Sequence, residues 1–175
     1  MIRDLKFNFL LKRHADEIFR FTRGILGDAA EAEDVTQEVF LKLWHHLAEV
    51  RLSKGRAWLY QTARRHAIDC VRRRSAVSQP VLADGDSLPE LPSGESDLPS
   101  SAADLPGLRD DLDRALQGLP EQYRAVFLLY ELNGLRYREI ATTLELPLNT
   151  VKVYLARARK QLQEQLKEHA SWIRN

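Results

Sequence analysis

Cysteine is almost absent from the chain, since Cys70 is the single residue of its type. One cysteine forms no intramolecular disulfide and offers no metal-ligand spacing, which excludes a disulfide-stabilised scaffold and a cysteine-ligated zinc site. No run of about 18 apolar residues occurs, so a transmembrane helix is not expected either. The first residues, Met-Ile-Arg-Asp-Leu-Lys, are not followed by the uninterrupted apolar core of a signal peptide. We therefore expect a cytoplasmic protein that does not insert into a membrane.

Regular alternation of apolar and polar residues, the pattern of half-buried strands, does not extend over any useful length of the chain. Apolar residues recur instead every three or four positions, which is the period of an α-helix. The first such series ends at Gly27, and Asp28 followed by Glu31 is typical of the start of the next helix. The sequence thus predicts an all-α fold without a sheet.

Proline and charge divide the chain into three parts. Residues 77–108 contain five of the seven prolines, six acidic residues and neither Lys nor Arg. Because proline removes backbone donors and interrupts helices, we expect this acidic segment, rich in Pro and Ser, to be a flexible linker. Residues 1–76 and 109–175 carry net charges of +5 and +2, which the total of +1 conceals. We predict two small helical domains over these ranges, an N-terminal bundle and a C-terminal helix-turn-helix domain.

The segment YREIATTLELPLNTVKVYLARARK, residues 137–160, predicts a helix-turn-helix. Pro147 prevents one continuous helix, and Asn149 is expected to cap the second helix. At about 100° per residue, the second helix turns one apolar stripe inward, formed by Val151, Leu155, Ala158 and Leu162. The opposite face is basic or small, as a helix in a DNA major groove requires, although a solvated charged face has the same composition. The expected DNA-binding residues on this face are Asn149, Thr150, Lys152, Val153, Arg157 and Lys160.

A second basic helix is predicted over residues 56–74, RAWLYQTARRHAIDCVRRR. One side of it carries small and aliphatic core positions, and the other side mixes cations with a tryptophan and an isoleucine. Cations interleaved with an aromatic ring are typical of proteins that contact single-stranded or opening DNA. Two alternatives stay open, namely Trp58 as a core residue and Arg72 as part of a solvated helix end. The expected DNA contacts on this helix are Trp58, Gln61, Arg64, Arg65, Ile68 and Arg72.

Three motifs in the right order resemble the extracytoplasmic function class of bacterial RNA polymerase sigma factors. The segment GDAAEAEDVTQEVFLKLW resembles the family's segment that grips the clamp helices of the polymerase beta-prime subunit. The helix RAWLYQTARRHAIDCVRRR resembles its promoter-melting and minus-ten-reading helix. The segment LPEQYRAVFLLYELNGLRYREIATTLELPLNTVKVYLARARKQL resembles its minus-thirty-five-reading domain. Together the resemblance covers residues of about 5–74 and 110–168, which is almost everything except the linker.

This resemblance implies an alternative initiation factor that binds core RNA polymerase, through the beta-prime clamp helices and the beta flap, and directs it to promoter DNA. Residues 1–76 would bind the polymerase and the downstream, minus-ten element, and residues 109–175 would bind the upstream, minus-thirty-five element. The loop over residues 48–55 would hold an unstacked base of the melted downstream element. The expected polymerase contacts are Asp34, Gln37, Glu38, Phe40, Leu43 and Trp44, with a core position for Phe40 left open. No catalysis, cofactor or metal is expected.

An inhibitory partner, an anti-sigma factor, is expected from an apparent surplus of apolar surface at Val39, Phe40, Leu43 and Trp44. Within the resemblance, Arg65 replaces a frequent Asn, which puts the usual minus-ten base preference in doubt. Tyr154 replaces a frequently basic position that would lie beside the DNA groove. Glu145 replaces a frequent Gly, so the turn either avoids a positive φ or carries strain of about 1 kcal/mol. The acidic linker either stands in for nucleic acid in the polymerase or acts only as a tether.

Two other functions are alternatives to this one. A stand-alone helix-turn-helix regulator would explain residues 137–160 but would leave the second basic helix and the acidic linker without a role. An enzyme would use His45, His46 and Glu49, or His14 with Asp16, as a metal or acid-base site. Adjacent histidines point about 100° apart on a helix and no further ligand cluster accompanies them, so we do not expect catalysis.

Overall fold

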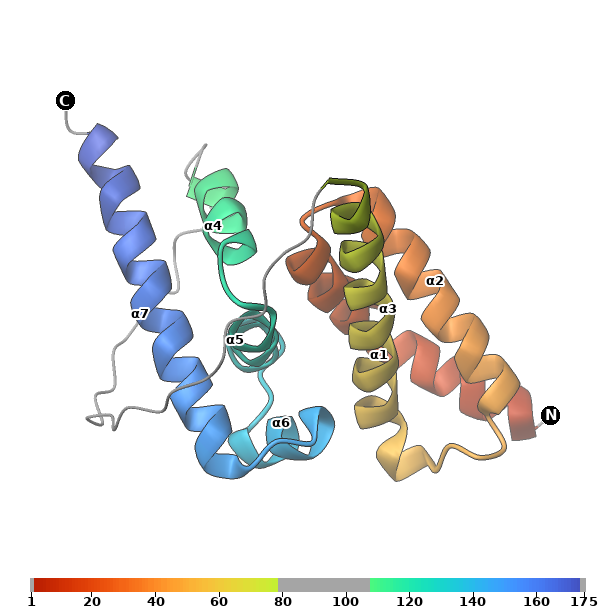
Figure 1. Cartoon of the computed structure of the whole chain (residues 1–175). Helices are drawn as coiled ribbons and strands as arrows, with labels where there is room; N and C mark the ends of the chain where they lie inside the picture. Colours follow the sequence, from red (N-terminus) through yellow and green to blue (C-terminus); the bar gives the residue numbers. More distant parts are fainter. Residues whose placement is uncertain (1, 79–107, 174–175) are drawn as a thin grey trace.

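The computed structural model describes residues 2–78 and 108–173, and no strand occurs in these two ranges, which confirms the all-α prediction. The N-terminal module consists of α1 (Ile2–Leu26), α2 (Ala29–His46), the 3-10 turn η1 (Leu52–Lys54) and α3 (Gly55–Ser78). The C-terminal module consists of α4 (Leu108–Gln117), α5 (Glu121–Phe127), the π-helical turn η3 (Leu128–Leu132), α6 (Tyr137–Leu144) and α7 (Leu148–Ile173). Figure 1 shows the two modules side by side. The predicted linker over residues 77–108 falls almost entirely outside the described residues.

The connection between α1 and α2 follows the sequence prediction. Gly27 ends α1 with a positive φ of 73°, a conformation that glycine adopts without a steric penalty. Asp28 then caps α2, because its Oδ1 accepts a hydrogen bond of 2.8 Å from the backbone N–H of Glu31. This short turn brings α2 back along α1, so the two helices pack against each other.

The core of the N-terminal module lies where α1, α2 and α3 meet. The rings of Phe21 from α1 and Tyr60 from α3 pack edge to face, with their centroids 5.3 Å apart. From α2, Val39 and Leu43 point into the same core and are fully buried. Burial of side chains of this size is the main source of stability for a module this small.

The C-terminal module packs α5 and the first half of α7 against each other. The inward stripe predicted for the second helix of the helix-turn-helix is confirmed, since each of its members is at most 3% exposed: Val151, Leu155, Ala158 and Leu162. Helix α5 continues directly into η3, where the N–H of Asn133 donates to the carbonyl of Leu128 at 3.1 Å. Gly134 follows with a φ of 64°, a conformation that glycine adopts without a steric penalty, and ends this helix.

The turn of the helix-turn-helix contains a residue in an unusual conformation. Glu145 has φ 57° and ψ 40°, so the left-handed alternative left open by the sequence is the one observed. A side chain in this region costs about 1 kcal/mol relative to glycine. The prediction that Asn149 caps the next helix is wrong, because α7 begins at Leu148 and the carbonyl of Pro147 already accepts from the N–H of Val151 at 3.1 Å.

The two modules also pack against each other, which the sequence did not predict. Helix α1 contacts α4, α5 and η3, and helix α3 contacts α6. The buried side chain of Arg124 in α5 reaches across and donates to the carbonyl of Ile25 at 2.7 Å. Burial lowers the pKa of the Arg124 guanidinium from its usual value. One continuous group of buried apolar side chains therefore runs through both modules.

Candidate nucleic-acid and polymerase interfaces

The predicted upstream DNA-binding residues lie on the side of α7 that faces away from the buried stripe. Asn149, Lys152 and Lys160 are exposed, and Thr150, Val153 and Arg157 are partly exposed. Their side chains combine a short amide, a hydroxyl and a small aliphatic with long cations. Such a face can approach a DNA groove closely and still reach phosphates with Lys and Arg.

Two aromatic residues determine how Arg157 is held on this helix. The Nη1 atom of Arg157 donates to the hydroxyl of Tyr123 at 2.8 Å, and its guanidinium lies 5.9 Å from the centroid of that ring. The ring of Tyr123 packs in turn on Tyr154, with centroids 4.9 Å apart. Tyr154 is buried, so the expectation that it lies beside the DNA groove is wrong. Its ring packs on Tyr123, the residue that accepts the hydrogen bond from Arg157.

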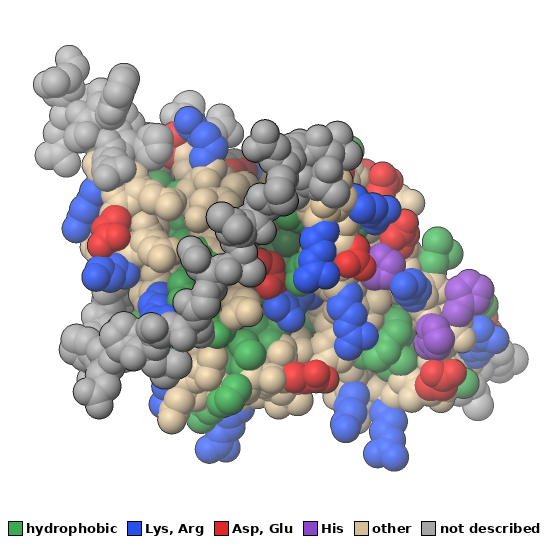
Figure 2. Space-filling view, in the orientation of Figure 1, with side chains coloured by type: hydrophobic (Ala, Val, Ile, Leu, Met, Phe, Trp, Pro, Cys, Tyr) green, Lys and Arg blue, Asp and Glu red, His purple; other side chains and the backbone are tan. Residues whose placement is uncertain are grey.

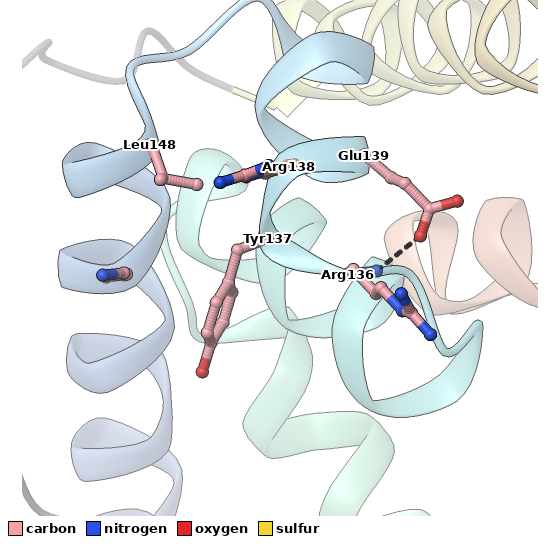
Figure 3. Close-up of a pocket in the computed structure, with 6 residues that line it drawn as sticks. Arg136, Tyr137, Arg138, Glu139 and Leu148 are labelled. Carbon is pink, nitrogen blue, oxygen red and sulfur yellow. Dashed lines mark hydrogen bonds between the residues drawn. The ribbon is translucent and has the colours of Figure 1, made fainter.

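A hollow of about 710 Å³ adjoins the start of α7 and is lined from α6, from the residue before it and from α7. Figure 3 shows that Arg138 of α6 and Leu148 of α7 point toward each other across it. The lining residues are Arg136, Tyr137, Arg138, Glu139, Leu148 and Lys152. Three of them are cations and one is an acid, so the hollow has an excess of positive charge.

The acid in the hollow is already engaged by its own helix. Glu139 Oε2 accepts a hydrogen bond of 2.8 Å from the backbone N–H of Arg136, which closes the first turn of α6. Arg136 and Arg138, by contrast, place positive charge at a helix N-terminus, where the macrodipole disfavours cations. Their position therefore does not stabilise the helix and suits an anionic ligand outside it.

Helix α3 carries the predicted downstream DNA-binding residues on its outer side. Arg65 and Arg72 are exposed, and Trp58, Gln61, Arg64 and Ile68 are partly exposed. Trp58 packs near the ring of His46, with centroids 6.4 Å apart, so one ring edge is supported and part of the ring stays accessible. In the view of Figure 2, Lys and Arg side chains spread over both modules with acidic side chains between them.

Two of these α3 residues are already paired with the C-terminal module. Arg64 makes a bidentate ion pair with Glu121, in which Nε and Nη2 each donate at 2.8 Å. Gln61 Nε2 donates to Glu145 Oε1 at 3.4 Å. The structure thus brings the candidate downstream residues together on one helix, but it does not leave all of them free.

The start of α3 is fixed by a polar group around Glu17 of α1. Glu17 Oε2 accepts hydrogen bonds of 3.0 Å from Arg56 Nε and from the Tyr60 hydroxyl. Burial disfavours the charge on Arg56, but the carboxylate of Glu17 outweighs this effect, so the pKa of Arg56 is raised. Burial raises the pKa of Tyr60, and the adjacent Glu17 carboxylate raises it further. Burial also lowers the pKa of His14, which lies one turn before Glu17.

The loop over residues 48–55 is anchored on one side and exposed on the other. Lys6 of α1 donates from Nζ to the carbonyl of Leu47 at 2.6 Å and also to the carbonyl of Val50. Leu52, at the tip, is 51% exposed, and its neighbours Arg51 and Ser53 are exposed too. A loop held in this way can present an apolar side chain and backbone groups to a base.

The predicted polymerase contacts on α2 divide into two groups. Asp34, Gln37 and Glu38 are exposed on the outer face, and Glu38 Oε2 lies 2.8 Å from His66 Nδ1 of α3. Phe40 and Leu43 are only 6% and 0% exposed, because they belong to the buried core. The core position left open for Phe40 is therefore the one observed. The prediction that Leu43 contacts polymerase is wrong, since a partner could reach this side chain only by opening the core.

Two further apolar side chains of α2, Trp44 and Leu41, are partly or largely exposed. Trp44 is partly exposed and is held between the ring of Phe7, at 5.1 Å, and the guanidinium of Arg3, at 4.6 Å. Leu41 is 61% exposed and was missed from the sequence. It lies on the same outer face of α2 as Asp34, Gln37 and Glu38, which it follows by seven, four and three residues. The expected surplus of apolar surface at Val39, Phe40, Leu43 and Trp44 is wrong, because these residues mainly form the core.

The residues considered for a metal or acid-base site lie apart. His46 Nδ1 and Glu49 Oε2 form an exposed pair at 3.3 Å, whereas His14 is buried beside Glu17. Within residues 2–78 and 108–173, no group of three or more His, Cys, Asp or Glu side chains is placed to hold a metal ion.

No helix in the described part of the chain has the length and apolar character needed to span a bilayer.

Comparison with known proteins assigns both modules. Residues 10–77 match the family model for Sigma-70 region 2, and residues 109–162 match that for Sigma-70, region 4. The ECF RNA polymerase sigma factor SigL of Mycobacterium tuberculosis is 34% identical over 161 residues, which cover 91% of this chain and 88% of SigL. The chain belongs to the ECF family of RNA polymerase sigma factors. It is accordingly an alternative sigma factor for transcription initiation, as the sequence resemblance implied.

Other relatives of this sigma factor agree with the assignment. The RNA polymerase sigma-H factor of Pseudomonas aeruginosa is 30% identical over 176 residues, which cover 91% of this chain and 86% of the relative. SigE of Mycolicibacterium smegmatis is 33% identical over 164 residues, which cover 93% of this chain. The match spans only 62% of the length of SigE. The region 2 match over residues 10–77 is not expected of a stand-alone helix-turn-helix regulator.

Solved structures show the same fold. The sigma factor RpoE of Bartonella quintana, solved in complex with the anti-sigma factor NepR, superposes with a TM-score of 0.68 at 24% identity. That match covers 92% of this chain and 96% of RpoE. CnrH, solved with the cytosolic domain of CnrY, gives a TM-score of 0.63 at 21% identity and covers 93% of this chain and 88% of CnrH. Two helical domains of this type are therefore the fold of this sigma factor.

Proposed function

We propose that this sigma factor brings core RNA polymerase to promoters by reading two DNA elements with two separate modules. The C-terminal module, residues 109–175, would bind the upstream element, and the N-terminal module, residues 1–76, would bind polymerase and the downstream element. The chain would act by binding alone, without making or breaking a covalent bond, and in the cytoplasm. The observation that carries this proposal is the cationic hollow beside the outward face of α7.

Upstream recognition would combine base contacts with phosphate contacts. The short side chains of Asn149 and Val153 allow α7 to approach base edges, where amide and apolar contacts discriminate between bases. Arg138 and Lys152, on either side of the hollow, would hold a phosphate group and so fix the register of α7 on the duplex. Arg157, supported by Tyr123, would contact the DNA further along the same face.

Downstream recognition would use the outer side of α3 together with the 48–55 loop. Arg65 and Arg72 would neutralise phosphates of the opening strands, while Trp58 and Ile68 would contact unstacked bases. Leu52, exposed at the tip of the anchored loop, would pack against a base taken out of the stack. Arg64 would join them once it is released from Glu121.

Polymerase binding would use the exposed outer face of α2. Asp34, Gln37 and Glu38 supply carboxylate and amide groups there, and Leu41 supplies an exposed apolar side chain at their side. A face with an apolar centre and a polar edge is typical of a protein interface. The beta-prime clamp helices are its proposed partner, and the beta flap would contact the C-terminal module.

An anti-sigma factor is a further proposed partner. Its support comes from the solved neighbours, since RpoE was solved with the anti-sigma factor NepR and CnrH with the cytosolic domain of CnrY. The exposed Leu41 offers an apolar contact for such a partner. A partner bound there would also compete with polymerase for the same face of α2.

The test is a selection of promoter fragments from a random DNA library by the chain bound to core polymerase. Asn149→Ala, which removes a proposed base contact, should weaken selection of the upstream element, and Ile68→Ala should weaken selection of the downstream element. Glu164→Ala, an exposed position on α7 beyond the DNA-binding face, serves as the control. Equal effects of Asn149→Ala and Ile68→Ala on both elements would contradict the assignment of one element to each module.

A further inference from the structure

The loop that connects α2 to α3 is shaped in part by backbone hydrogen bonds of its own. The carbonyl of His46, the last residue of α2, accepts from the N–H groups of Glu49 at 3.0 Å and of Val50 at 3.2 Å. The N–H of Lys54 donates to the carbonyl of Arg51 at 2.9 Å. All of these bonds are local, so they give the loop its turns but do not fix its position on the module.

Two cations of α1 fix the position of the loop. Lys6 Nζ donates to the carbonyl of Leu47 at 2.6 Å and also to the carbonyl of Val50. One turn earlier, Arg3 Nη2 donates to the carbonyl of Trp44 at 2.8 Å. Carbonyls at a helix C-terminus lack partners within the helix, and the macrodipole favours cations there. The start of α1 therefore completes the end of α2 and holds the loop that follows (Figure 1).

The far end of the loop also lies against α1. Gly55, the first residue of α3, is buried, and a Cβ atom there would lie 2.8 Å from Leu10 Cδ2. Lys6 and Leu10 are four residues apart, so they share one face of α1 and hold the two ends of the loop. Between these ends, Leu52 is 51% exposed at the tip. The exposed tip is thus carried by a backbone that α1 holds on both sides.

We propose that Lys6 is a positioning residue for the reading of one unstacked base of the downstream element. The proposed function gives the contact with this base to Leu52, and the inference rests on that proposal. Lys6 would not touch DNA; it would hold the loop backbone so that Leu52 meets the base in one geometry. A recognition group has to stay within about 0.5 Å of its productive position, which a loop without outside support does not ensure. Loss of the Lys6 bonds should therefore reduce discrimination at that base rather than binding as a whole.

The two cations of α1 have different roles at this end of α2. The guanidinium of Arg3 lies 4.6 Å from the ring centroid of Trp44 and bonds the carbonyl of the same residue, so Arg3 holds α2 itself. The ammonium of Lys6 carries three donors on a flexible stem and reaches two carbonyls, one before the loop and one within it. A loop held in this way has less conformational freedom to lose when a base binds. Lys6 is therefore the side chain through which α1 controls the loop.

A set of substitutions separates positioning from direct contact. Lys6→Met keeps an apolar stem of similar length and removes the donors, whereas Lys6→Arg keeps a charged donor. Leu52→Ala removes the proposed base contact itself. Lys12→Met is the matched control, because Lys12 is exposed on the same helix and the substitution removes the same charge.

The assay selects fragments from a duplex library that is randomised over the downstream element, with the full-length chain bound to core polymerase. The readout is the ratio of the preferred base to the other bases at each position. Leu52→Ala should lower this ratio at one position from about ten-fold to below about three-fold, as the loss of one base contact predicts. Lys6→Met should lower the ratio at the same position and leave the other positions unchanged. Lys6→Arg should keep most of the ratio, and Lys12→Met should keep all of it.

The double variant of Lys6→Met with Leu52→Ala tests whether the two residues act on the same base. Residues that serve one contact are not additive, so the double variant should lose no more discrimination than Leu52→Ala alone. A loss spread over every position, or an equal loss for Lys6→Met and Lys12→Met, would show a general effect of structure or charge and overturn the inference. An unchanged ratio for Lys6→Met would overturn it as well.

A second variant keeps the test decisive if Lys6→Met does not fold, which circular dichroism would show. Residue 55 has a φ of −56°, which alanine adopts in a helix, so Gly55→Ala should fold while its Cβ displaces Leu10 at the far end of the loop. A lower ratio at the position that Leu52→Ala affects would support the inference. A ratio that Gly55→Ala leaves unchanged would overturn it.

Failure of the proposed function has a different signature from failure of the inference. If Leu52→Ala affects no position, the role proposed for the loop fails, and the inference fails with it. If Leu52→Ala affects one position and a folded Lys6→Met does not, only the positioning role of Lys6 fails. Gel filtration with core polymerase accompanies each selection, because a chain that does not bind polymerase would contradict the proposed function as a whole.

Discussion

Lys152→Ala provides a quantitative test of the phosphate site beside α7. The lysine is exposed, lines the cationic hollow with Arg136 and Arg138, and faces the side proposed to bind DNA. Each neutralised phosphate contributes about 0.9 to the slope of log affinity against log salt on duplex DNA. Losing one contact should therefore reduce the slope by about 0.9 and weaken binding to all promoter sequences alike.

The size of the effect follows from this slope. Between about 50 and 200 mM salt, a single contact changes the affinity by about three- to four-fold, so the two proteins should differ most at low salt. The assay is fluorescence anisotropy of a labelled duplex promoter fragment with the chain bound to core polymerase. The polymerase's own contacts cancel in the difference between variants.

Lys167→Ala is the matched control for this measurement. Lys167 is exposed on the same helix, about 22 Å further along at a rise of about 1.5 Å per residue, and lies outside the hollow. Its loss should leave the salt slope unchanged. An unchanged slope for Lys152→Ala, or an equal decrease for both lysines, would refute the phosphate site.

Three further predictions concern stability and the α2 face. Glu145→Gly should raise the free energy of unfolding by about 0.5–1 kcal/mol in denaturant titrations, because glycine removes the left-handed strain. Thr142→Gly, in the regular part of α6, should instead lower the free energy of unfolding by about 0.3–0.5 kcal/mol. The free energy of unfolding should fall as the pH drops below 6.5. The reason is that burial lowers the pKa of His14 in the folded state, so the unfolded state takes up the proton first. His14→Leu should flatten this pH dependence. Phe40→Ala should lower the free energy of unfolding by about 3–5 kcal/mol, because the side chain is buried. Leu41→Ala should change it by less than about 0.5 kcal/mol, because the side chain is exposed. The same Leu41→Ala variant should weaken polymerase binding in a pull-down. A large loss of stability for Leu41→Ala would contradict its exposed position.

Local features of the fold could be predicted from the sequence because they depend on neighbouring residues. Asp28 identifies the start of α2 by its own side chain, and the buried stripe of α7 follows from spacing alone. The period groups residues by helix face, but it does not show whether a face packs on another helix or binds a partner. For this reason Leu43 was assigned to a contact surface, and Phe40 was left open between a contact and a core position. Leu41, on the polar face of α2, was missed.

Features that depend on distant parts of the chain could not be predicted. Arg64 meets Glu121 only after both modules have folded, and no local pattern marks either residue as a partner of the other. Arg136 and Arg138 were missed because cations next to a short helix resemble a solvated surface. Their shared hollow with Lys152 becomes visible only when α6 and α7 are placed together.

The most direct test of the central claim is run-off transcription with purified core polymerase and a linear promoter library, with and without the chain. We expect initiation at a defined subset of templates only when the chain is present, together with a stable complex of chain and core in gel filtration. Transcription that is the same in both reactions, or a chain that fails to associate with core polymerase, would contradict its function as a two-module sigma factor.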